Sequence, residues 1–317
     1  MGLSSAPRGP APVLVVADGG AQASLGHLAR CGAVAVALQG RGIPCRCVAV
    51  GSDAPAPSAL AWEWVADADA LPDTGVSLLL LDSYRLDPVT VRAHTGAVKL
   101  AVMHDIGPVP ESADLVLTTD PGLAGMRPEI VGGPALCCLG PMFWGLPAPR
   151  PVAAEVRKVL ITTGGGDPSG HGVAIAYALA DALPGREITL VRGPHTELSP
   201  LTGIHILDRP PSLLHPLREA DLTVTSAGNS LLEALAVGSP TVAVIVAENQ
   251  RSGAQALADR GATQLAEPEP LEALEALVAT VRALAEDPEL RGHQVRAGRE
   301  LVDGYGALRV AYLLSEL

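Results

Sequence analysis

Short apolar runs rich in β-branched residues alternate along the chain with longer segments rich in Ala and Leu. The short runs are apolar throughout, which is typical of strands that are covered on both faces in parallel α/β sheets. In the N-terminal half this pattern predicts strands at 13–17, 45–50, 76–81, 99–103 and 115–118 and helices at 28–39 and 89–95. In the C-terminal half it predicts strands at 159–163, 187–191, 204–207, 222–225 and 241–245 and helices at 172–183, 213–219, 230–237, 251–260, 271–287 and 289–304.

The segment 141–154 separates the two arrays and is the best candidate for a linker, because it is rich in proline. Its four prolines are Pro141, Pro147, Pro149 and Pro151. We therefore expect an α/β protein of two Rossmann-like domains, residues 1–148 and 149–317, that face each other across a cleft. Ligands of such domains bind at the carboxyl ends of the strands, and a cleft between domains is the usual site.

Composition narrows the range of functions. The 317 residues carry a formal net charge of −12 and only 3% are aromatic, which disfavours a nucleic-acid-binding surface. The five cysteines include no C-x-x-C pair, which argues against a zinc ribbon or disulfide scaffold and fits a reducing compartment. We see no targeting signal and no stretch of the roughly 20 apolar residues that span a membrane. We expect a cytoplasmic protein without an integral membrane segment, and the oligomeric state stays open.

The segment 162–169 (TTGGGDPS) follows a predicted strand and precedes a predicted helix. Gly164, Gly165 and Gly166 allow a ligand to approach the backbone closely, and free N–H groups at the helix start favour phosphate. A Walker A loop is excluded, because His171 and Gly172 stand where Lys and Ser or Thr are required. The alternative is a plain tight turn.

The segment 226–233 (SAGNSLLE) forms a second predicted junction of strand and helix. Its loop residues Ala227, Gly228 and Asn229 and the start of the helix suit a pyrophosphate, and Glu233 suits a ribose diol. The alternative is a capping box, in which Ser230 and Glu233 satisfy the helix start themselves. A third loop, 247–251, carries Asn249 and Gln250, and together the three loops favour a nucleotide site.

His27 opens the first predicted helix of the N-terminal half. The helix dipole favours the neutral imidazole there, so His27 is a candidate general base. The alternative is a polar cap near the surface, and Arg30, one turn further on, is equally compatible with a solvent-facing position.

Two further groups follow predicted strands in this half. Asp82 and Tyr84 lie at the carboxyl edge of the predicted sheet, where Tyr84 is suited to orient a sugar hydroxyl or a water. Its alternative is an ordinary half-buried tyrosine. His104 ends another strand and is compatible with an exposed loop position. Asp67 and Asp69 form a D-x-D pair that we interpret as solvated surface, because no strand flanks it.

These motifs, in this order, resemble the pseudaminic-acid-pathway UDP-sugar hydrolases and their spore-coat-polysaccharide relatives, a family similar to the MurG-type glycosyltransferases of GT-B fold. The matching stretches are GHLARC (26–31), LLLDSYRLD (79–87), VMHD (102–105), ITTGGGDPSG (161–170), DLTVTSAGNSLLEALAVGSPTVAVIVAENQ (221–250) and DGYGALRV (303–310). The chain departs from the family at 17–21 (ADGGA), where an Arg-x-Asp-x-Ser segment is usual, and at 23–25 (ASL), before His27.

The resemblance implies a GT-B-like fold whose C-terminal domain binds the uracil, ribose and diphosphate. Glu233 would hold the ribose, and the loops 164–166 and 227–230 the diphosphate. His27 would work near the anomeric carbon, with Tyr84 and Asn249 near the sugar. We assign Arg30, Asp82, His104 and Gln250 to the sugar and acceptor side.

The function expected from these residues is cleavage of the anomeric C–O bond of a UDP-sugar with release of UDP, without a metal or cofactor. His27 activates the attacking hydroxyl, and backbone dipoles stabilise the leaving diphosphate. If water attacks, the protein is a hydrolase, which is our first expectation. If a small-molecule or glycan hydroxyl attacks, it is a glycosyltransferase. A non-catalytic nucleotide-sugar-binding partner protein is a further alternative, and a dehydrogenase is disfavoured because no G-x-G-x-x-G follows the first strand.

Overall fold

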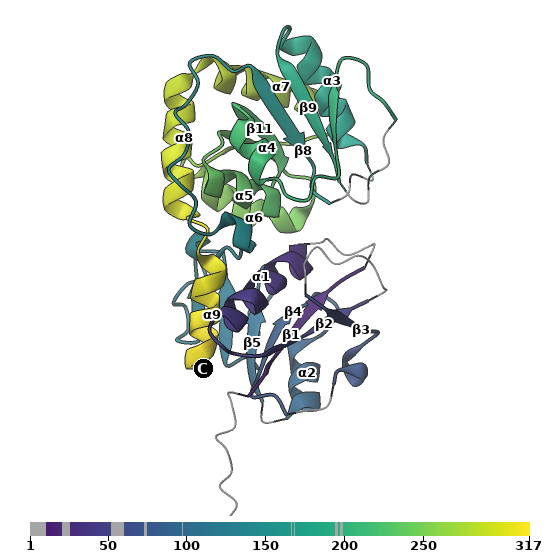
Figure 1. Cartoon of the computed structure of the whole chain (residues 1–317), viewed down its shortest axis with the longest axis vertical. Helices are drawn as coiled ribbons and strands as arrows, with labels where there is room; N and C mark the ends of the chain where they lie inside the picture. Colours follow the sequence, from purple (N-terminus) through teal and green to yellow (C-terminus); the bar gives the residue numbers. More distant parts are fainter. Residues whose placement is uncertain are drawn as a thin grey trace, which may run out of the picture. The chain divides into compact units, whose positions relative to one another are not determined.

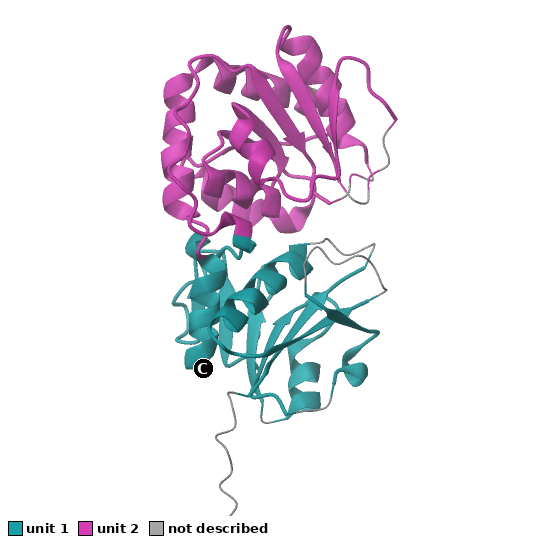
Figure 2. Ribbon diagram, viewed as in Figure 1, with its two compact units in different colours: residues 1–141, 306–317 teal, residues 142–305 magenta. Residues whose placement is uncertain are grey.

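The computed structural model describes residues 11–20, 26–51, 60–72, 75–96, 98–165, 167, 169–193, 196 and 199–317. The chain folds into two compact units (Figures 1 and 2), which we call the N-terminal unit, residues 1–141 and 306–317, and the C-terminal unit, residues 142–305. Each unit is built on one parallel sheet flanked by helices. The predicted fold class, two Rossmann-like domains of α/β type, is confirmed.

The sheet of the N-terminal unit has the strand order β3-β2-β1-β4-β5-β6-β7. These strands are β1 (Val13–Asp18), β2 (Cys45–Val50), β3 (Trp62–Val65), β4 (Leu78–Asp82), β5 (Lys99–Met103), β6 (Leu115–Thr118) and β7 (Ile130–Gly132). The strand order reverses between β1 and β4, where Ala17 pairs with Asp82 at the carboxyl ends. This is the topological switch point at which sheets of this kind bind ligands.

Helices cover both faces of this sheet. On one face α2 (Pro88–Thr95) and the short helix η1 (Ala68–Ala70) pack on alternate strand residues such as Val16 and Leu81. On α1 (Gly26–Gly40) the side chains of Leu28, Val34 and Leu38 are fully buried. The short helix η2 (Pro134–Leu136) follows β7. The two buried faces explain why the central strands are mostly apolar instead of alternating between apolar and polar residues.

The last helix, α9 (Gly306–Glu316), belongs to the N-terminal unit, where it packs on α1 and η2. A Cβ at Gly306 would lie 2.1 Å from the carbonyl oxygen of Cys137, so only glycine permits this close approach. The sequence pattern predicts one helix over 289–304, but helix α8 ends at Leu301 and Gly304 has a φ of 87°. The units therefore divide at 141/142 and 305/306, not at a single boundary after residue 148.

The sheet of the C-terminal unit has the order β10-β9-β8-β11-β12-β13, again parallel throughout. Its strands are β8 (Lys158–Thr162), β9 (Glu187–Arg192), β10 (His205–Asp208), β11 (Leu222–Ser226), β12 (Thr241–Val244) and β13 (Gln264–Ala266). The order reverses between β8 and β11, where Thr162 pairs with Thr225. The two glycine-rich segments follow these two strands, so they lie at the switch point of this sheet.

The helices of this unit are α3 (His171–Ala182), α4 (Leu214–Glu219), α5 (Asn229–Val237), α6 (Arg251–Ala258), α7 (Leu271–Glu286) and α8 (Pro288–Leu301), with short helices η3 (Pro141–Phe143, at the unit boundary) and η4 (Glu248–Gln250). Helices α3 and α7 bury Ile175, Leu179 and Leu277 against one face of the sheet. Arg291 of α8 is fully buried and donates to the carbonyl oxygens of Leu284 and Ala153, which ties the start of this unit to the end of α7.

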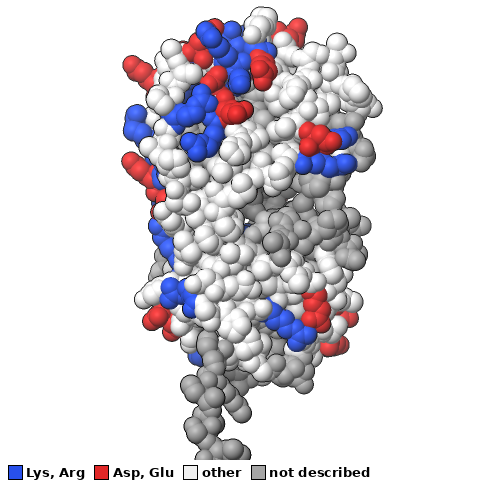
Figure 3. Space-filling view, in the orientation of Figure 1, with Lys and Arg blue, Asp and Glu red and all other residues white. Residues whose placement is uncertain are grey.

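The predicted strands were all observed, and those not predicted are the edge strands β3, β7 and β13 of three or four residues. Such strands pair on one side only and lack the long apolar run of a central strand. In the part of the chain that the structure describes, no helix is long and apolar enough to cross a membrane. On the face drawn in Figure 3, acidic and basic side chains lie side by side in several places.

Candidate active site

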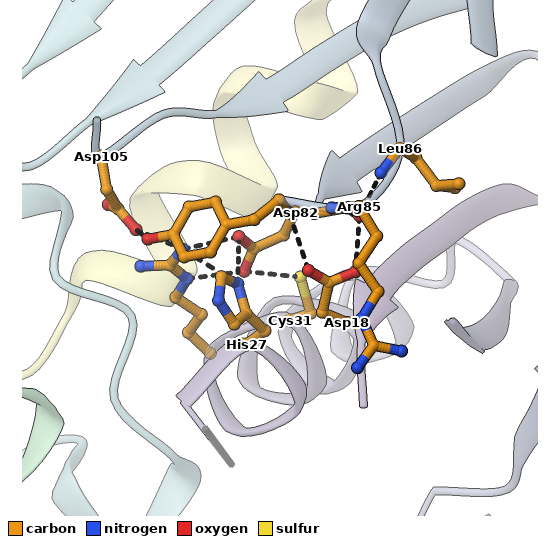
Figure 4. Close-up of polar contacts among 10 residues, drawn as sticks. Asp18, His27, Cys31, Asp82, Arg85, Leu86 and Asp105 are labelled. Carbon is orange, nitrogen blue, oxygen red and sulfur yellow. Dashed lines mark hydrogen bonds and ion pairs between the residues drawn. The ribbon is translucent and has the colours of Figure 1, made fainter. Parts of the chain in front are cut away.

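His27 and Asp82 meet at the switch point of the N-terminal sheet (Figure 4). His27 lies in the first turn of α1, Asp82 is the last residue of β4, and the His27 Nδ1 lies 2.7 Å from Asp82 Oδ1. When Nδ1 donates to the carboxylate, Nε2 is the unprotonated and basic atom of the ring. The His27 side chain is 6% exposed, so the ring orientation is fixed by its packing and by this hydrogen bond.

Arg30 completes the arrangement one turn along α1. Its Nε donates to Asp82 Oδ2 at 2.6 Å, and its Nη2 donates to Asp82 Oδ1 and to Asp105 Oδ2, each at 2.6 Å. Arg30 therefore does not simply face solvent. It binds the carboxylate of Asp82 at the end of β4 and that of Asp105, which follows β5. The bidentate contact is the strongest form of this ion pair.

Asp82 stays ionised although it is fully buried. Burial alone would raise the pKa of its carboxyl, but the charge and hydrogen bonds of Arg30 and the bond from His27 outweigh this effect and hold the pKa of Asp82 well below its usual range. Both carboxylate oxygens are occupied by these partners, so Asp82 has no surface for a sugar. Its geometry is that of a residue that orients His27.

Tyr84 and Asp105 form the exposed side of this cluster. Tyr84 is 48% exposed, its hydroxyl donates to Asp105 Oδ2 at 2.9 Å, and its ring meets the His27 ring edge-on with centroids 4.7 Å apart. Cys31 lies beneath, 3.5 Å from Asp82, and burial followed by the nearby carboxylate raises its pKa well above the usual thiol value, which makes it unreactive. His104 is the residue directly after β5, and it is buried rather than exposed.

In the C-terminal unit the start of α5 is open. Its N-cap is Gly228, which has no side chain that could cap the helix, and among the described residues no carboxylate accepts from the first amides. The alternative interpretation of this segment, a capping box of Ser230 and Glu233, is wrong, because the helix begins at Asn229 and places Ser230 inside its first turn. Backbone amides and the helix dipole at such an end favour an anion.

The start of α3 is closed instead. The carboxylate of Asp167 accepts hydrogen bonds from the amides of His171 and Gly172, at 3.0 and 2.8 Å. The expectation that this helix offers free amides to a phosphate is wrong, because a side chain of the same loop already occupies them. Gly164 and Gly165 remain near the open junction, since a Cβ at Gly164 would lie 3.5 Å from Ser226 Oγ. Gly166 lies outside the described residues.

Glu233 is a half-buried carboxyl on the first turns of α5, with no hydrogen bond or ion pair to the described residues. Burial without a partner raises its pKa to about 7. A carboxyl in this position gains most from a ligand that donates hydrogen bonds to it, and a diol is such a ligand.

The loop after β12 lies next to the α5 junction. Gln250 Oε1 accepts from the amide of Val246 at 3.3 Å, and a Cβ at Gly228 would lie 3.5 Å from Gln250 Nε2. Asn249 is exposed in η4. Both residues thus belong to the C-terminal unit, and Gln250 lies beside the N-terminal end of α5. Ala227 is buried, and its amide donates to the carbonyl oxygen of Val244.

Sequence reasoning missed several residues of the two sites. Asp105 and Asp167 lie in motifs that the sequence singled out, 102–105 and 162–169, but no role was assigned to them; Asp105 follows a strand and Asp167 precedes a helix, which are the signals that could have given them one. The pair Asp67 and Asp69 is exposed as expected, and Asp67 accepts from the amide of Ala70 in η1.

The fold is the GT-B fold of glycosyltransferases. The structure of MurG from Acinetobacter baumannii matches 97% of this chain and 100% of that chain with a TM-score of 0.68 and 15% identity. The spinosyn rhamnosyltransferase SpnG, solved with thymidine diphosphate and also with spinosyn aglycone, gives a TM-score of 0.63 at 18% identity in both complexes. The complex with thymidine diphosphate covers 96% of this chain and 99% of that chain.

In sequence, the chain is similar to the spore coat polysaccharide biosynthesis protein SpsG of Bacillus subtilis (strain 168). The two are 26% identical over 200 residues, and the match spans 60% of this chain and 59% of the length of SpsG. No protein-family model matches the chain. The resemblance to the spore-coat-polysaccharide proteins and to MurG-type enzymes, expected from the motifs, is confirmed.

Proposed function

We propose that this protein is a glycosyltransferase that moves a sugar from a nucleoside diphosphate to the hydroxyl of a small-molecule or glycan acceptor. The observation that carries the proposal is the His27–Asp82 pair, with a 2.7 Å hydrogen bond, at the switch point of a GT-B fold. The bond leaves Nε2 of His27 available as a base. Asp82 holds the His27 ring through this hydrogen bond and Arg30 holds Asp82, so both act as positioning residues.

In the proposed reaction His27 Nε2 takes the proton of the acceptor hydroxyl. The acceptor oxygen forms a bond to the anomeric carbon, the bond from that carbon to the diphosphate oxygen breaks, and its electron pair leaves with the nucleoside diphosphate. The ionised Asp82 stabilises the imidazolium that results, and the proton then passes to solvent. General-base help of this kind contributes typically about 10²- to 10⁴-fold.

The nucleotide half of the substrate fits the open start of α5. The uncapped first turn offers backbone amides and a favourable dipole to the diphosphate, both before and after the bond breaks. Glu233, about one turn further along the same helix, would accept hydrogen bonds from the ribose hydroxyls. Gly164, Gly165 and Ser226 border the same junction, and Asn249 and Gln250 of the neighbouring loop would contact the diphosphate or the sugar.

Transfer rather than hydrolysis is favoured by the structural neighbours. SpnG is a rhamnosyltransferase by name, and it has been solved with thymidine diphosphate and with spinosyn aglycone. Hydrolysis, our first expectation from the motifs, uses the same residues with water as the nucleophile. Uridine as the base, a cytoplasmic location and independence from metals and cofactors are part of this proposal, and the five free cysteines agree with a reducing compartment.

The test begins with a thermal-shift screen of UDP, TDP, ADP, GDP and CDP. A nucleotide present at about 100 times its dissociation constant should stabilise the protein by about 2.7 kcal/mol. Release of the selected diphosphate is then measured from its sugar conjugates, with and without acceptors and with and without EDTA.

Release that requires an acceptor and persists in EDTA supports the proposal. Equal release without an acceptor identifies a hydrolase. A nucleotide that binds without turnover under any of these conditions identifies a binding protein, and the absence of stabilisation by all five nucleotides would overturn the proposal.

A further inference from the structure

Asp18 is a buried carboxylate that the reaction above does not use. It is the last residue of β1, it is 3% exposed, and its side chain points to the loop that follows β4 (Figure 4). Asp18 Oδ1 accepts from the hydroxyl of Ser83 at 2.5 Å, and Oδ2 accepts from the amide of Tyr84 at 2.7 Å. Both oxygens are engaged by the loop and the residue is buried, so the contacts of Asp18 are structural ones.

Ser83 extends this contact along the loop. Its Oγ accepts hydrogen bonds from the amides of Arg85 and Leu86, at 3.0 and 2.9 Å. A hydroxyl has two acceptor sites and one donor, so the two amides fill the acceptor sites and direct the hydrogen to Asp18. The carboxylate thus fixes the backbone on both sides of Tyr84.

Tyr84 needs this support because its ring has little packing of its own. It is 48% exposed, yet it places its hydroxyl on Asp105 and its ring against His27. A tyrosine has only two side-chain torsions, so a fixed backbone goes far towards fixing the ring.

We propose that Asp18 is a positioning residue, which holds the loop 83–86 so that Tyr84 orients His27 and Asp105 for the reaction. The proposal rests on the function proposed above, because it assigns Asp18 to the same site. It predicts that Asp18 acts through Tyr84 alone and not through nucleotide binding.

The first test is Asp18→Asn, with Ser83→Ala as a second variant that breaks the same contact without removing a charge. Asparagine can accept only one of the two hydrogen bonds. Its NH₂ would face either the amide of Tyr84 or the hydroxyl of Ser83, and neither of these donors can reorient to accept a hydrogen bond. We expect kcat to fall about 10- to 100-fold for Asp18→Asn, and less for Ser83→Ala, while the affinity for the nucleoside diphosphate stays unchanged. Asp87→Asn is the matched control, because Asp87 only caps α2 and asparagine caps equally well.

The second test is a double-mutant cycle. If Asp18 acts through Tyr84, Asp18→Asn should lower kcat less than about twofold in a Tyr84→Ala background. Effects that multiply in the double variant would overturn the proposal, and so would an unchanged kcat in Asp18→Asn.

The third test needs no substrate and therefore separates this proposal from the proposed function. The ring protons of His27, observed by NMR in the full chain, should carry a ring-current shift from Tyr84 that Tyr84→Ala removes. Asp18→Asn and Ser83→Ala should move these resonances towards the Tyr84→Ala values. The control Asp87→Asn should leave the resonances and the melting temperature of the protein unchanged. Resonances that stay at their wild-type positions in both variants would overturn the proposal even if no turnover is ever detected.

Discussion

The two glycine-rich junctions of the C-terminal unit are alike in sequence and different in structure. Each follows a central strand at the switch point and leads into a helix on the adjoining connection. At α3 the carboxylate of Asp167 occupies the first amides, whereas at α5 the N-cap is Gly228 and no described carboxylate takes that place. We therefore expect the proposed diphosphate site at the second junction rather than at the first.

The difference teaches that glycine permits a phosphate to approach but does not provide its binding site. Whether a helix start can bind phosphate depends on whether a nearby side chain already accepts hydrogen bonds from its first backbone amides. The half-buried Glu233, whose pKa is raised to about 7, lies on the helix with the open start. The start of α5 and the carboxyl of Glu233 therefore lie on the same helix. The predictions below test whether both bind the nucleotide.

The largest expected effect is on the catalytic step and distinguishes it from nucleotide binding at the junctions of the C-terminal unit. Replacing His27 with Ala should lower kcat by about 10²- to 10⁴-fold, because the general base is lost. The affinity for the nucleoside diphosphate, measured by calorimetry, should stay within about twofold, since His27 is not part of the α5 junction. A parallel loss of nucleotide affinity would contradict the assignment of His27 to catalysis.

The next effect converts the open junction into a closed one. Gly228 has a φ of −102°, which any residue can adopt, so Gly228→Asp should cap α5 as Asp167 caps α3. We expect the free energy of unfolding to rise by about 0.5–1 kcal/mol and the diphosphate affinity to fall about 10- to 100-fold through charge repulsion. Gly228→Ala is the control for size alone. Unchanged affinity in Gly228→Asp would remove the α5 junction from the nucleotide site.

A smaller effect concerns Glu233 and pH. Its folded-state pKa of about 7 lies above the ordinary value of 4.5, so the folded chain holds an extra proton between these values and loses stability as pH rises through this window. Glu233→Gln should therefore raise the free energy of unfolding at pH 8 by about 1–3 kcal/mol.

Nucleotide binding should respond in the opposite direction. The ionised carboxylate accepts ribose hydrogen bonds better, so wild-type affinity should rise between pH 6 and 8 and level off above, as the pKa of about 7 requires. Glu233→Gln should flatten this profile and weaken binding at pH 8 by about 3- to 10-fold. A profile that keeps its slope in the variant would assign the titration to another group.

The smallest effect tests the closed junction. Asp167→Ala should lower the free energy of unfolding by about 0.5–2 kcal/mol, because α3 loses its cap. It should not weaken diphosphate binding, as calorimetry would show, and Asp167→Asn should retain part of the stability. A tenfold loss of affinity in Asp167→Ala would show that the α3 loop belongs to the nucleotide site after all.

Much of the fold was predictable because the central strands are mostly apolar and rich in β-branched residues. The runs at 13–17 and 222–225 are buried on both faces, and the polar residues of the second run are both β-branched threonines, which also favour a strand. The edge strand β3 and the helix α9 were not predicted. Trp62–Val65 is short and half exposed, and α9 continues a helical pattern whose break at Val302–Tyr305 depends on packing against Phe143.

The candidate site was predictable as a list of residues, but not as an arrangement. His27, Tyr84 and Glu233 could be chosen from motifs that follow strands, and the structure places His27 and Tyr84 in contact. The partners of these residues come from distant segments, as with Asp82, which lies 55 positions from His27. No local pattern indicates that Asp82 is buried under Arg30, or that Asp18 supports the Tyr84 loop.

The sequence by itself determined the alternation of strands and helices, and with it two parallel sheets with functional residues at their carboxyl edges. Periodicity and chain connectivity are local properties, and they suffice for this much. Only the tertiary structure decided which helix start is left open, which carboxylates are paired and to which unit the last helix belongs. These outcomes depend on side chains that meet only after folding, where a single carboxylate can satisfy or leave unsatisfied a helix end.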